Sequence, residues 1–539
     1  MKVFRIIFTP FTLCIIGCAS LTTPTGGPKD LKPPILIKSI PTPNQTNFKG
    51  STVELVFDEY VKLNNPKEEI IISPTPSKNI EIKAKGTRVT ITPEEKWKDS
   101  TTYSIVLREG VQDITESNSP PNLKIAFSTG PNIDSLSISG HVSNVLQGTP
   151  ADKITVALYA IDTFNIFTHS PGYFTKTDKN GKYKLENIKT GIYSVYAFDD
   201  KSKNLKVESR TERYGFLKDK INLNRKIDSV DLGLIMMDSR ALKITAIRNV
   251  GTITRVRFNK YVSDYTLQPD EKLTHAFGDN QTELIIWNPT SIIDSLQLHL
   301  IATDSIQSQV DSSFYIKKTD IKPIKEPFKW SLGEPSVEAE TGYFKTLMKF
   351  SKPLLTLNFD SIFIQLDTTS RIPIVKENIR IDQLHKEIAL SKNLDKQLFT
   401  GEKDPQLTLK TGKGFITSID NDTTKSMSIA VPILWPEDTG ILLLQVSTTQ
   451  KDYIIQLLTK EGKLVRSIQN VTKYTFKNLP PAEYGIRIII DTNKNGKWDP
   501  GNITKGLEPE KVVFYKAPNG KPNFPLRANW EYGPLILRF

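Results

Sequence analysis

The chain has 539 residues and a formal net charge of +12, from 71 Lys and Arg against 59 Asp and Glu. Hydrophobic residues make up 38% and charged residues 24% of the sequence, which excludes a disordered chain and a bundle of membrane helices. Only five histidines are present, which leaves little for metallohydrolase or histidine-base chemistry, and the basic residues are spread along the chain rather than clustered as in nucleic-acid-binding proteins.

The first eighteen residues predict the compartment. Residues 1–5 form a short basic start, and residues 6–16 form an apolar core that is too short to span a bilayer. Residues 15–18 read Ile-Ile-Gly-Cys and resemble a bacterial lipobox. The resemblance implies that residues 1–17 are a lipoprotein signal peptide and that Cys18 is acylated and becomes the mature N-terminus. A plain secretory signal with a chance cysteine is the alternative.

The cysteine count limits the chemistry of the predicted mature chain. Cys14 lies in the segment that would be removed, so Cys18 is the one cysteine left. No disulfide, zinc knuckle or cysteine nucleophile is then expected. Acyl chains on Cys18 would provide the membrane anchor, and no later run approaches eighteen apolar residues.

Residues 18–34 are predicted to be a tether, because their Pro and Gly content disfavours both helix and strand. Within them, residues 24–34 resemble the start of a Bacteroidota lipoprotein family that carries an Ig-like domain. In that phylum, acidic residues directly after the cysteine tend to mark lipoproteins exported to the cell surface. The first acid here is Asp30, twelve positions after Cys18. The resemblance therefore implies the periplasmic face of the outer membrane.

The rest of the sequence predicts an all-β fold. Short runs with strand character alternate with Pro, Gly, Asn and Asp, which is typical of tandem β-sandwich domains. Residues 383–391 are the one short helix candidate. The first predicted strands are residues 53–57, 80–84, 89–92, 103–107 and 124–128.

A five-residue motif occurs three times, at residues 57–61, 258–262 and 350–354. It consists of Phe, a small polar residue, a charged residue, Tyr or Pro, and Val or Leu. Each copy follows an apolar alternating run, so it predicts a strand that ends at the rim of a sandwich and turns with an apolar plug.

The first copy of the motif belongs to a longer pattern. Trp97, Tyr103, Asp113 and the Phe-Ser-Thr-Gly ending at residues 127–130 follow it. Together they resemble the bacterial Ig-like domain of the SbsA type, found in surface-layer and secreted proteins. The resemblance covers residues 31–130 well and is weaker in the regions around the other two copies of the motif.

A second repeat aligns residues 183–204 on residues 474–495 without a gap. The turn before the first copy lies at residues 178–181, and Glu461-Gly462 is expected to take its place before the second. The first copy resembles the transthyretin-like sandwich of carboxypeptidase regulatory domains. The identical pairs are Tyr183/Tyr474, Asn187/Asn478, Tyr193/Tyr484, Asp200/Asp491, Lys203/Lys494 and Asn204/Asn495.

These patterns predict five domains after the tether, each of a size that can bury its own core. Their order is an SbsA-type Ig-like domain at 35–132, a transthyretin-like domain at 133–240, Ig-like domains at 241–320 and 321–433, and a transthyretin-like domain at 434–539.

One loop carries a candidate metal site. Asp491, Asn493, Asn495 and Asp499 stand at positions 1, 3, 5 and 9 of a loop with Gly496 at position 6. Oxygen ligands at this spacing resemble the opening of an EF-hand or dockerin loop and point to Ca²⁺. Position 12 is Asn502 rather than Glu, although Glu508 or Glu510 could complete the shell. The alternative is a turn whose side chains cap backbone N–H groups.

The aligned loop of the first copy offers Asp200, Ser202, Asn204 and Glu208 at the same offsets. No nucleophile elbow, zinc-protease helix motif or phosphate-binding loop is found, so no catalytic residues are predicted. Six tryptophans are more typical of cores than of sugar-binding faces, with Trp498 in the polar loop as the best binding candidate.

The sequence therefore predicts a non-catalytic outer-membrane lipoprotein that faces the periplasm and acts as a scaffold or assembly partner. Its partner would be a protein or an envelope polymer, with no cofactor required beyond the candidate Ca²⁺. A surface-displayed glycan-binding or adhesive lipoprotein is the first alternative, and an enzyme without a readable motif is the second.

Overall fold

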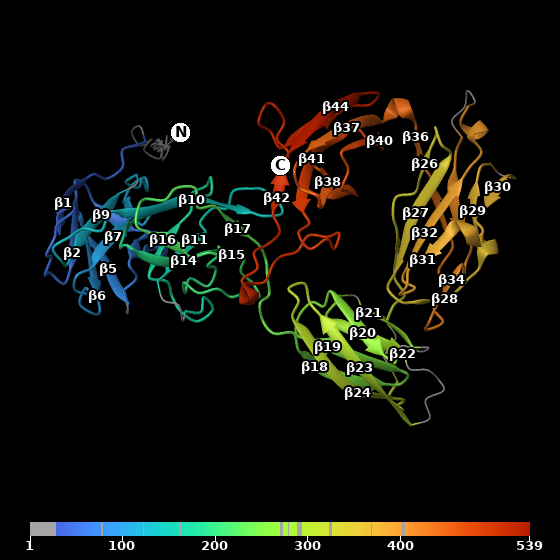
Figure 1. The fold of residues 1–539 in the computed structure, drawn as a ribbon, viewed down its shortest axis with the longest axis horizontal. Coiled ribbons are helices and arrows are strands. Elements are labelled where there is room, and N and C mark those ends of the chain that lie inside the picture. The colour runs from blue at the N-terminus through green and yellow to red at the C-terminus, as the bar shows by residue number, and fades with distance from the viewer. Residues whose placement is uncertain are drawn as a thin grey trace, which may run out of the picture. The chain divides into compact units, whose positions relative to one another are not determined.

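The computed structural model describes residues 29–539 apart from 77–78, 122, 161–163, 270–272, 279, 288–293, 323–325, 368 and 401–404. The described chain holds 44 strands, one four-residue helix, α1 (Pro66–Glu69), and five short 3₁₀ helices. This confirms the predicted all-β fold of tandem sandwiches (Figure 1). The chain divides into two compact units, one reaching to Ser135 together with Asn187–Lys189, and the other comprising the remaining residues.

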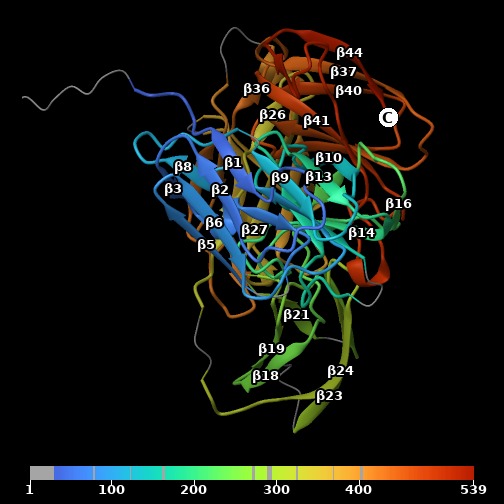
Figure 2. The same cartoon turned by 90° about the vertical axis from the view of Figure 1, so that its left-hand side faces the viewer.

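The first unit contains an Ig-like sandwich. Its four-stranded sheet has the order β1-β2-β6-β5, and a three-stranded sheet, β4-β7-β9, and the pair β3-β8 complete it (Figure 2). Trp97, Tyr103 and Phe127, which the sequence singled out, pack ring against ring in its core. The strands are β1 (Leu36–Ile40), β2 (Val53–Phe57), β3 (Val61–Leu63), β4 (Ile71–Ser73), β5 (Ile80–Lys85), β6 (Arg88–Pro93), β7 (Thr102–Val106), β8 (Val111–Asp113) and β9 (Lys124–Ser128).

The second unit begins with the first transthyretin-like repeat. Three strands form the sheet β13-β10-β17, and the second sheet has the order β12-β11-β14-β15, with β16 also paired to β14. The pair β10-β17 is parallel. The strands are β10 (Leu136–Asn144), β11 (Thr155–Tyr159), β12 (Tyr173–Lys176), β13 (Lys182–Ile188), β14 (Gly191–Phe198), β15 (Tyr214–Phe216), β16 (Ile221–Leu223) and β17 (Leu232–Leu234).

The last repeat has the same topology, strand for strand. Its sheets are β40-β37-β44, with β37-β44 parallel, and β39-β38-β41-β42, with β43 also paired to β41. The aligned residues Asn187 and Asn478 both have positive φ, as do Lys203 and Lys494. The strands are β37 (Gly440–Ser447), β38 (Tyr453–Thr459), β39 (Leu464–Gln469), β40 (Lys473–Leu479), β41 (Ala482–Ile490), β42 (Val512–Phe514), β43 (Asn523–Leu526) and β44 (Glu531–Arg538).

One predicted turn in this repeat is wrong. Glu461-Gly462 lies between β38 and β39, whereas the turn that matches residues 178–181 is the one between β39 and β40. There Asn470 has a φ of 53°, which only a few residue types adopt easily. The same alignment, carried back without a gap from the shared segment, places residues 178–181 on residues 469–472, which is this turn.

The third domain is a smaller sandwich. Its two sheets have the orders β18-β19-β22-β21 and β20-β23-β24, and Val256, Leu284, Leu298 and Leu300 lie in the core between them. The strands are β18 (Ile244–Val250), β19 (Ile253–Phe258), β20 (Asp264–Gln268), β21 (Thr274–Phe277), β22 (Glu283–Trp287), β23 (Ser295–Thr303) and β24 (Gln309–Lys317).

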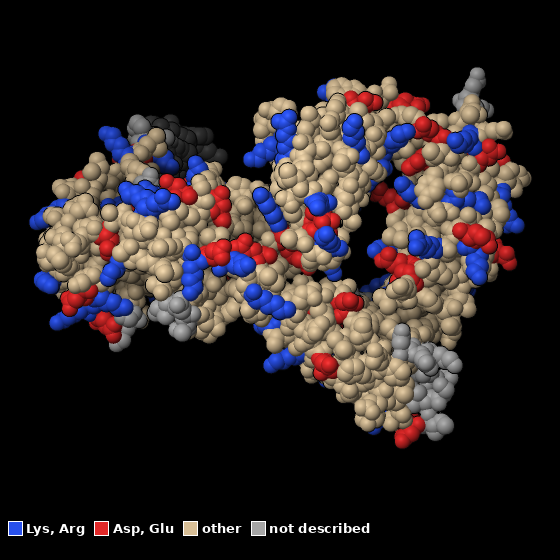
Figure 3. All heavy atoms as spheres, in the orientation of Figure 1, with Lys and Arg blue, Asp and Glu red and all other residues tan. Residues whose placement is uncertain are grey.

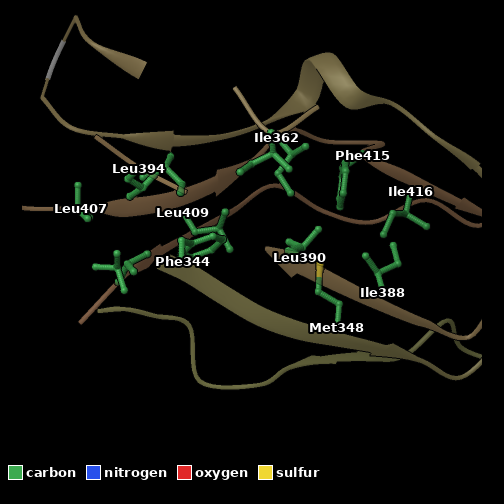
Figure 4. Packing of buried hydrophobic residues seen from close by; sticks show 14 of the residues in the cluster. Phe344, Met348, Ile362, Ile388, Leu390, Leu394, Leu407, Leu409, Phe415 and Ile416 are labelled. Carbon is green, nitrogen blue, oxygen red and sulfur yellow. The ribbon is translucent and has the colours of Figure 1, made fainter. Parts of the chain in front are cut away.

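The fourth domain has the largest described core, and Figure 4 shows its apolar side chains filling the interior between two layers. One sheet is β31-β32-β27-β26-β36 with β25 paired to β27; the other is β30-β29-β33-β35, beside the pair β28-β34. The strands are β25 (Trp330–Leu332), β26 (Ser336–Glu338), β27 (Tyr343–Phe350), β28 (Leu354–Leu357), β29 (Ile362–Gln365), β30 (Arg371–Pro373), β31 (Ile379–Ile381), β32 (Glu387–Asn393), β33 (Thr408–Thr411), β34 (Ile416–Ser418), β35 (Met427–Ala430) and β36 (Ile433–Leu434).

The helix predicted at residues 383–391 is wrong, because most of it belongs to strand β32. Ile388 and Leu390 are buried while Ala389 between them is exposed. This alternation has the period of a strand, and it places both large side chains in the core of the fourth domain.

Each copy of the five-residue motif begins at the last residue of a strand, as predicted, and in the second and third copies its charged residue forms ion pairs. Lys260, in the second copy, forms a buried ion pair with Asp304. Lys352, in the third copy, binds Asp420 and Asp422 at 2.9 and 2.6 Å. These bonds tie the end of one strand to a loop much later in the same domain.

The charged surface is mixed. On the face shown in Figure 3, Lys and Arg side chains lie among Asp and Glu side chains rather than in one block. That distribution agrees with the spacing of charges along the sequence.

Candidate functional site

The loop between β41 and β42 brings together the four side chains of the predicted calcium site. The buried carboxylate of Asp491 accepts the backbone N–H groups of Asn495 at 3.1 Å and of Gly496 at 2.8 Å. The side-chain amides of Asn493 and Asn495 donate to Asp499 Oδ2 at 2.9 and 2.6 Å. Gly496 has a φ of 77°, a backbone conformation that favours glycine.

A third acidic residue, Glu510, closes this loop. It lies two residues before β42 and is only 8% exposed. Its Oε1 accepts the N–H of Thr492 at 2.6 Å and its Oε2 accepts the N–H of Asp499 at 3.1 Å. Burial raises the pKa of Glu510 and the nearby Asp499 carboxylate adds to this, while the two N–H donors lower it; the net pKa lies above the ordinary value of 4.5.

Asn502 and Glu508, the other two residues considered as ligands of the predicted calcium ion, bind partners outside this loop. The side-chain amide of Asn502 donates to the carbonyl of Ile306 at 2.6 Å. Glu508 accepts the N–H of Lys218 at 2.6 Å. Both therefore connect the last repeat to earlier domains of the same unit.

The described arrangement satisfies the loop without a cation. Across residues 29–539, outside the gaps given above, no group of three or more His, Cys, Asp or Glu side chains is placed to hold a metal ion. Asp491 and Glu510 instead accept backbone N–H groups, as capping side chains do. Five oxygen-bearing side chains nevertheless converge on one turn, so the calcium assignment stays a prediction.

The matching loop of the first repeat is built in the same way. Asp200 Oδ1 accepts the N–H of Asn204 at 3.0 Å, as Asp491 does in the other copy. Glu212, which is 1% exposed, accepts the N–H groups of Ser202 at 3.1 Å and Glu208 at 2.8 Å. Burial raises the pKa of Asp200 above its ordinary value. Two acids that accept backbone N–H groups of the loop are therefore a property of the repeat, although Asp200 is only partly buried.

Sequence reasoning missed Glu212 and named Glu510 only as one of two possibilities. The signal that could have found them is their shared position, two residues before the strand that follows the loop. The loops differ in length, so an alignment without gaps cannot pair the two residues.

Trp498, which the sequence analysis named as the best binding candidate among the tryptophans, is partly buried. Its ring packs against a core cluster of the first repeat that includes Ile166 and Tyr214, and its Nε1 donates to the carbonyl of Glu510 at 3.1 Å. Ile503 joins the same cluster. Trp530 is the more accessible ring, at 45% exposed, with the Arg527 guanidinium 4.8 Å from its centre.

Two further acids, each next to a second acid in the sequence, also have structural partners. Asp199 binds Arg213 at 3.1 Å, and Asp58 accepts the N–H of Ile35 at 2.7 Å.

Cys18 and the predicted signal peptide at 1–17 lie outside the described residues, as does most of the predicted tether at 18–34. Within the described part of the chain, no helix combines the length and the hydrophobicity needed to cross a lipid bilayer.

Comparison with known proteins supports the fold. A family model for the bacterial Ig-like domain matches residues 30–129, which confirms the first Ig-like domain. No curated protein matches the chain.

Several solved structures match the chain at low identity and with low TM-scores. They include the major pilin subunit BcpA of Bacillus cereus, at 10% identity over 75% of this chain and 99% of that one, with a TM-score of 0.13. The glucan utilization locus protein SGBP-B of Bacteroides ovatus, solved with a mixed-linkage heptasaccharide, gives 14% identity over 70% and 89%, with a TM-score of 0.15. The S-layer protein rSbsC gives 12% over 89% and 67%, with a TM-score of 0.16. At these scores the similarities carry no inference about ligand or partner.

Proposed function

We propose that this multi-domain β scaffold is a non-catalytic lipoprotein of the cell envelope. Acyl chains on Cys18 hold it at the periplasmic face of the outer membrane, and it works by contact with a protein or an envelope polymer. The lipobox and the likeness of residues 24–34 to Bacteroidota lipoproteins support the anchor. The SbsA-type resemblance of the first domain supports a role in an extracytoplasmic layer.

The observation that most supports a non-catalytic role is the use made of the buried acids. The carboxylates of three buried acids accept hydrogen bonds from backbone N–H groups of their own loops; these acids are Glu212, Asp491 and Glu510. Catalytic carboxylates instead need a proton or a lone pair directed at substrate. These three acids therefore stabilise turns, and we take strand edges and loops as the contact surfaces of the scaffold.

Substituting Cys18→Ala should abolish acylation and release the protein from the membrane fraction, because no other thiol would remain for the acyl chains after processing. The measurement is metabolic labelling with an alkyne analogue of palmitate, followed by fractionation of the cells. Cys14→Ala is the matched control and should keep both the label and the membrane location. Label that persists in Cys18→Ala would refute the anchor.

Protease treatment of intact cells then separates the two orientations. A protein on the periplasmic face should stay intact until the outer membrane is opened. Cleavage in intact cells would instead favour the surface-displayed, glycan-binding or adhesive alternative.

We also propose that the loop of Asp491, Asn493, Asn495 and Asp499, with Glu510, binds Ca²⁺ as a structural ion. The expected dissociation constant is about 10⁻⁴–10⁻³ M, as in other extracellular calcium modules. Millimolar Ca²⁺ should then raise the unfolding temperature of the last domain, and a chelator should reverse the shift.

Calorimetric titration of the full chain checks this expectation. Asp491→Ala should remove the binding heat, while Asp438→Ala, an exposed acid of the same domain, should leave it unchanged. If the unsubstituted chain gives neither heat nor a thermal shift, the loop is a hydrogen-bonded turn only.

A further inference from the structure

The two transthyretin-like repeats share a topology but differ along one edge. In the first repeat, the edge strands β15 and β17 are joined where Tyr214 and Ile235 exchange backbone hydrogen bonds of 2.9 and 3.2 Å. Gly215 makes this possible, because a Cβ at that position would lie 2.0 Å from the carbonyl oxygen of Gly233. The side of the sandwich is therefore sealed.

The corresponding side of the last repeat is open. Gly215 lies opposite Ala197 in the first repeat, and the aligned position in the second has Val513 opposite Ile488. A valine cannot make the close approach that glycine allows. β42 and β44 are edge strands of their two sheets, and no pairing joins them among the strands that the structure describes.

The side chains along this edge are more exposed in the last repeat than in the first. In the first repeat, Tyr214 and Phe216 are 0% and 6% exposed. The three residues of β42 are all partly exposed, and Ile536 on β44 is 46% exposed. Between the two strands lies a groove of about 610 Å³, within the range of natural binding sites.

The lining of the groove indicates what it would accept. Ile488, Val513, Leu535 and Leu537 supply apolar walls from both sheets. Among the described residues that line it, the charged ones are Lys516 and Arg538, and none is Asp or Glu. A complementary occupant has apolar side chains with carboxylates beside them.

We propose that this groove binds an extended segment of another protein, which adds as a β strand along the edge of β44. Alternate apolar side chains of the segment enter the groove, and acidic residues at its ends meet Lys516 and Arg538. Edge strands carry backbone N–H and C=O groups available for such pairing, and pockets for alternate side chains give specificity. Pro534 lacks an N–H, so the pairing segment is Leu535–Arg538. The proposal rests on the scaffold function above and names the kind of partner that the scaffold holds.

The test uses the chain from Ala19 onward, without acylation, so that its outcome does not depend on the membrane anchor. The probe is a fluorescein-labelled peptide, Glu-Glu-Val-Thr-Val-Thr-Val-Glu-Glu, followed by fluorescence polarisation. Hydrogen exchange in the complex should show new protection at residues 512–516 and 535–538. A peptide with Lys in place of every Glu should bind at least about tenfold more weakly, since two favourable charge contacts become repulsive.

Charge reversal on the protein gives the matched comparison. The double variant Lys516→Glu, Arg538→Glu should lose about tenfold or more in affinity for the acidic peptide. Lys473→Glu, Lys477→Glu, on the opposite edge strand β40, makes the same change in net charge and should keep its affinity. Unchanged unfolding temperatures establish that both double variants fold.

Three results would overturn the proposal. Absence of binding is one, and protection that misses β42 and β44 is another. Concentration-dependent dimerisation of the chain that protects the same amides would make a second copy the occupant instead. If Cys18 proved not to be acylated but the peptide still bound, the lipoprotein assignment would be refuted and the groove proposal would be retained.

Discussion

Substituting Lys260→Met should lower the unfolding free energy of the third domain by about 3–5 kcal/mol, the usual cost of breaking one side of a buried ion pair. The side chains of Lys260 and Asp304 are 5% and 3% exposed. Lys260 Nζ also donates to the carbonyl of Asp238 at 3.0 Å. Methionine matches the length of the lysine stem but leaves the Asp304 charge buried without its counter-charge, and this uncompensated charge is the main source of the loss.

The measurement is urea unfolding of the full chain, with hydrogen exchange assigning the transition of the third domain. Lys243→Met removes an exposed lysine from the same domain and should change stability little. Adding Asp304→Asn to Lys260→Met should recover part of the loss, since the buried negative charge is then gone. Equal stability of Lys260→Met and Lys243→Met would contradict the buried pair.

Substituting Gly215→Val should cost the first transthyretin-like repeat about 3 kcal/mol, the upper end of what an overpacked core site loses. The added Cβ would meet the backbone oxygen of Gly233 at 2.0 Å, and neither strand can yield as a flexible side chain could. We expect β15 and β17 to separate, so that the amides of Tyr214 and Ile235 lose their protection from hydrogen exchange.

Gly172→Ala is the control for this prediction, because the contact recorded for its added Cβ is the Leu158 oxygen at 3.8 Å. That variant should unfold as the parent does. If Gly215→Val kept full protection at Tyr214 and Ile235, the explanation of the open edge in the last repeat by Val513 would also fail.

Much of the architecture could be predicted from the sequence, because a pattern that occurs in two copies rarely arises by chance. The gap-free alignment of residues 183–204 on 474–495 paired Tyr with Tyr and Asn with Asn, and the two topologies agree strand for strand. The motif at 258–262 predicted a strand end and placed a charged residue there. Its partner Asp304 is 44 positions away, and only the tertiary fold brings the two together.

In the candidate calcium loop, too, contacts between sequence neighbours could be predicted, whereas contacts with residues distant in the sequence could not. Asp491, Asn495 and Gly496 form a local turn, which their types and spacing predict. Glu510 reaches that turn only because β42 pairs with β41, and Trp498 is covered only because a different domain packs on it. Local spacing carries no information on either event.

The burial of Trp498 and Ile503 against the first repeat has a consequence for biosynthesis. The side chains that complete that core come from a loop that is made about 300 residues after β14 (Trp498 against Phe198), and Asn502 donates to the carbonyl of Ile306. In a chain that emerges N-terminus first, the apolar surface of the second domain that Trp498 and Ile503 cover would stay exposed until almost the whole polypeptide had emerged. Chaperones and proteases that recognise exposed apolar surface would thus distinguish a complete chain from a truncated one.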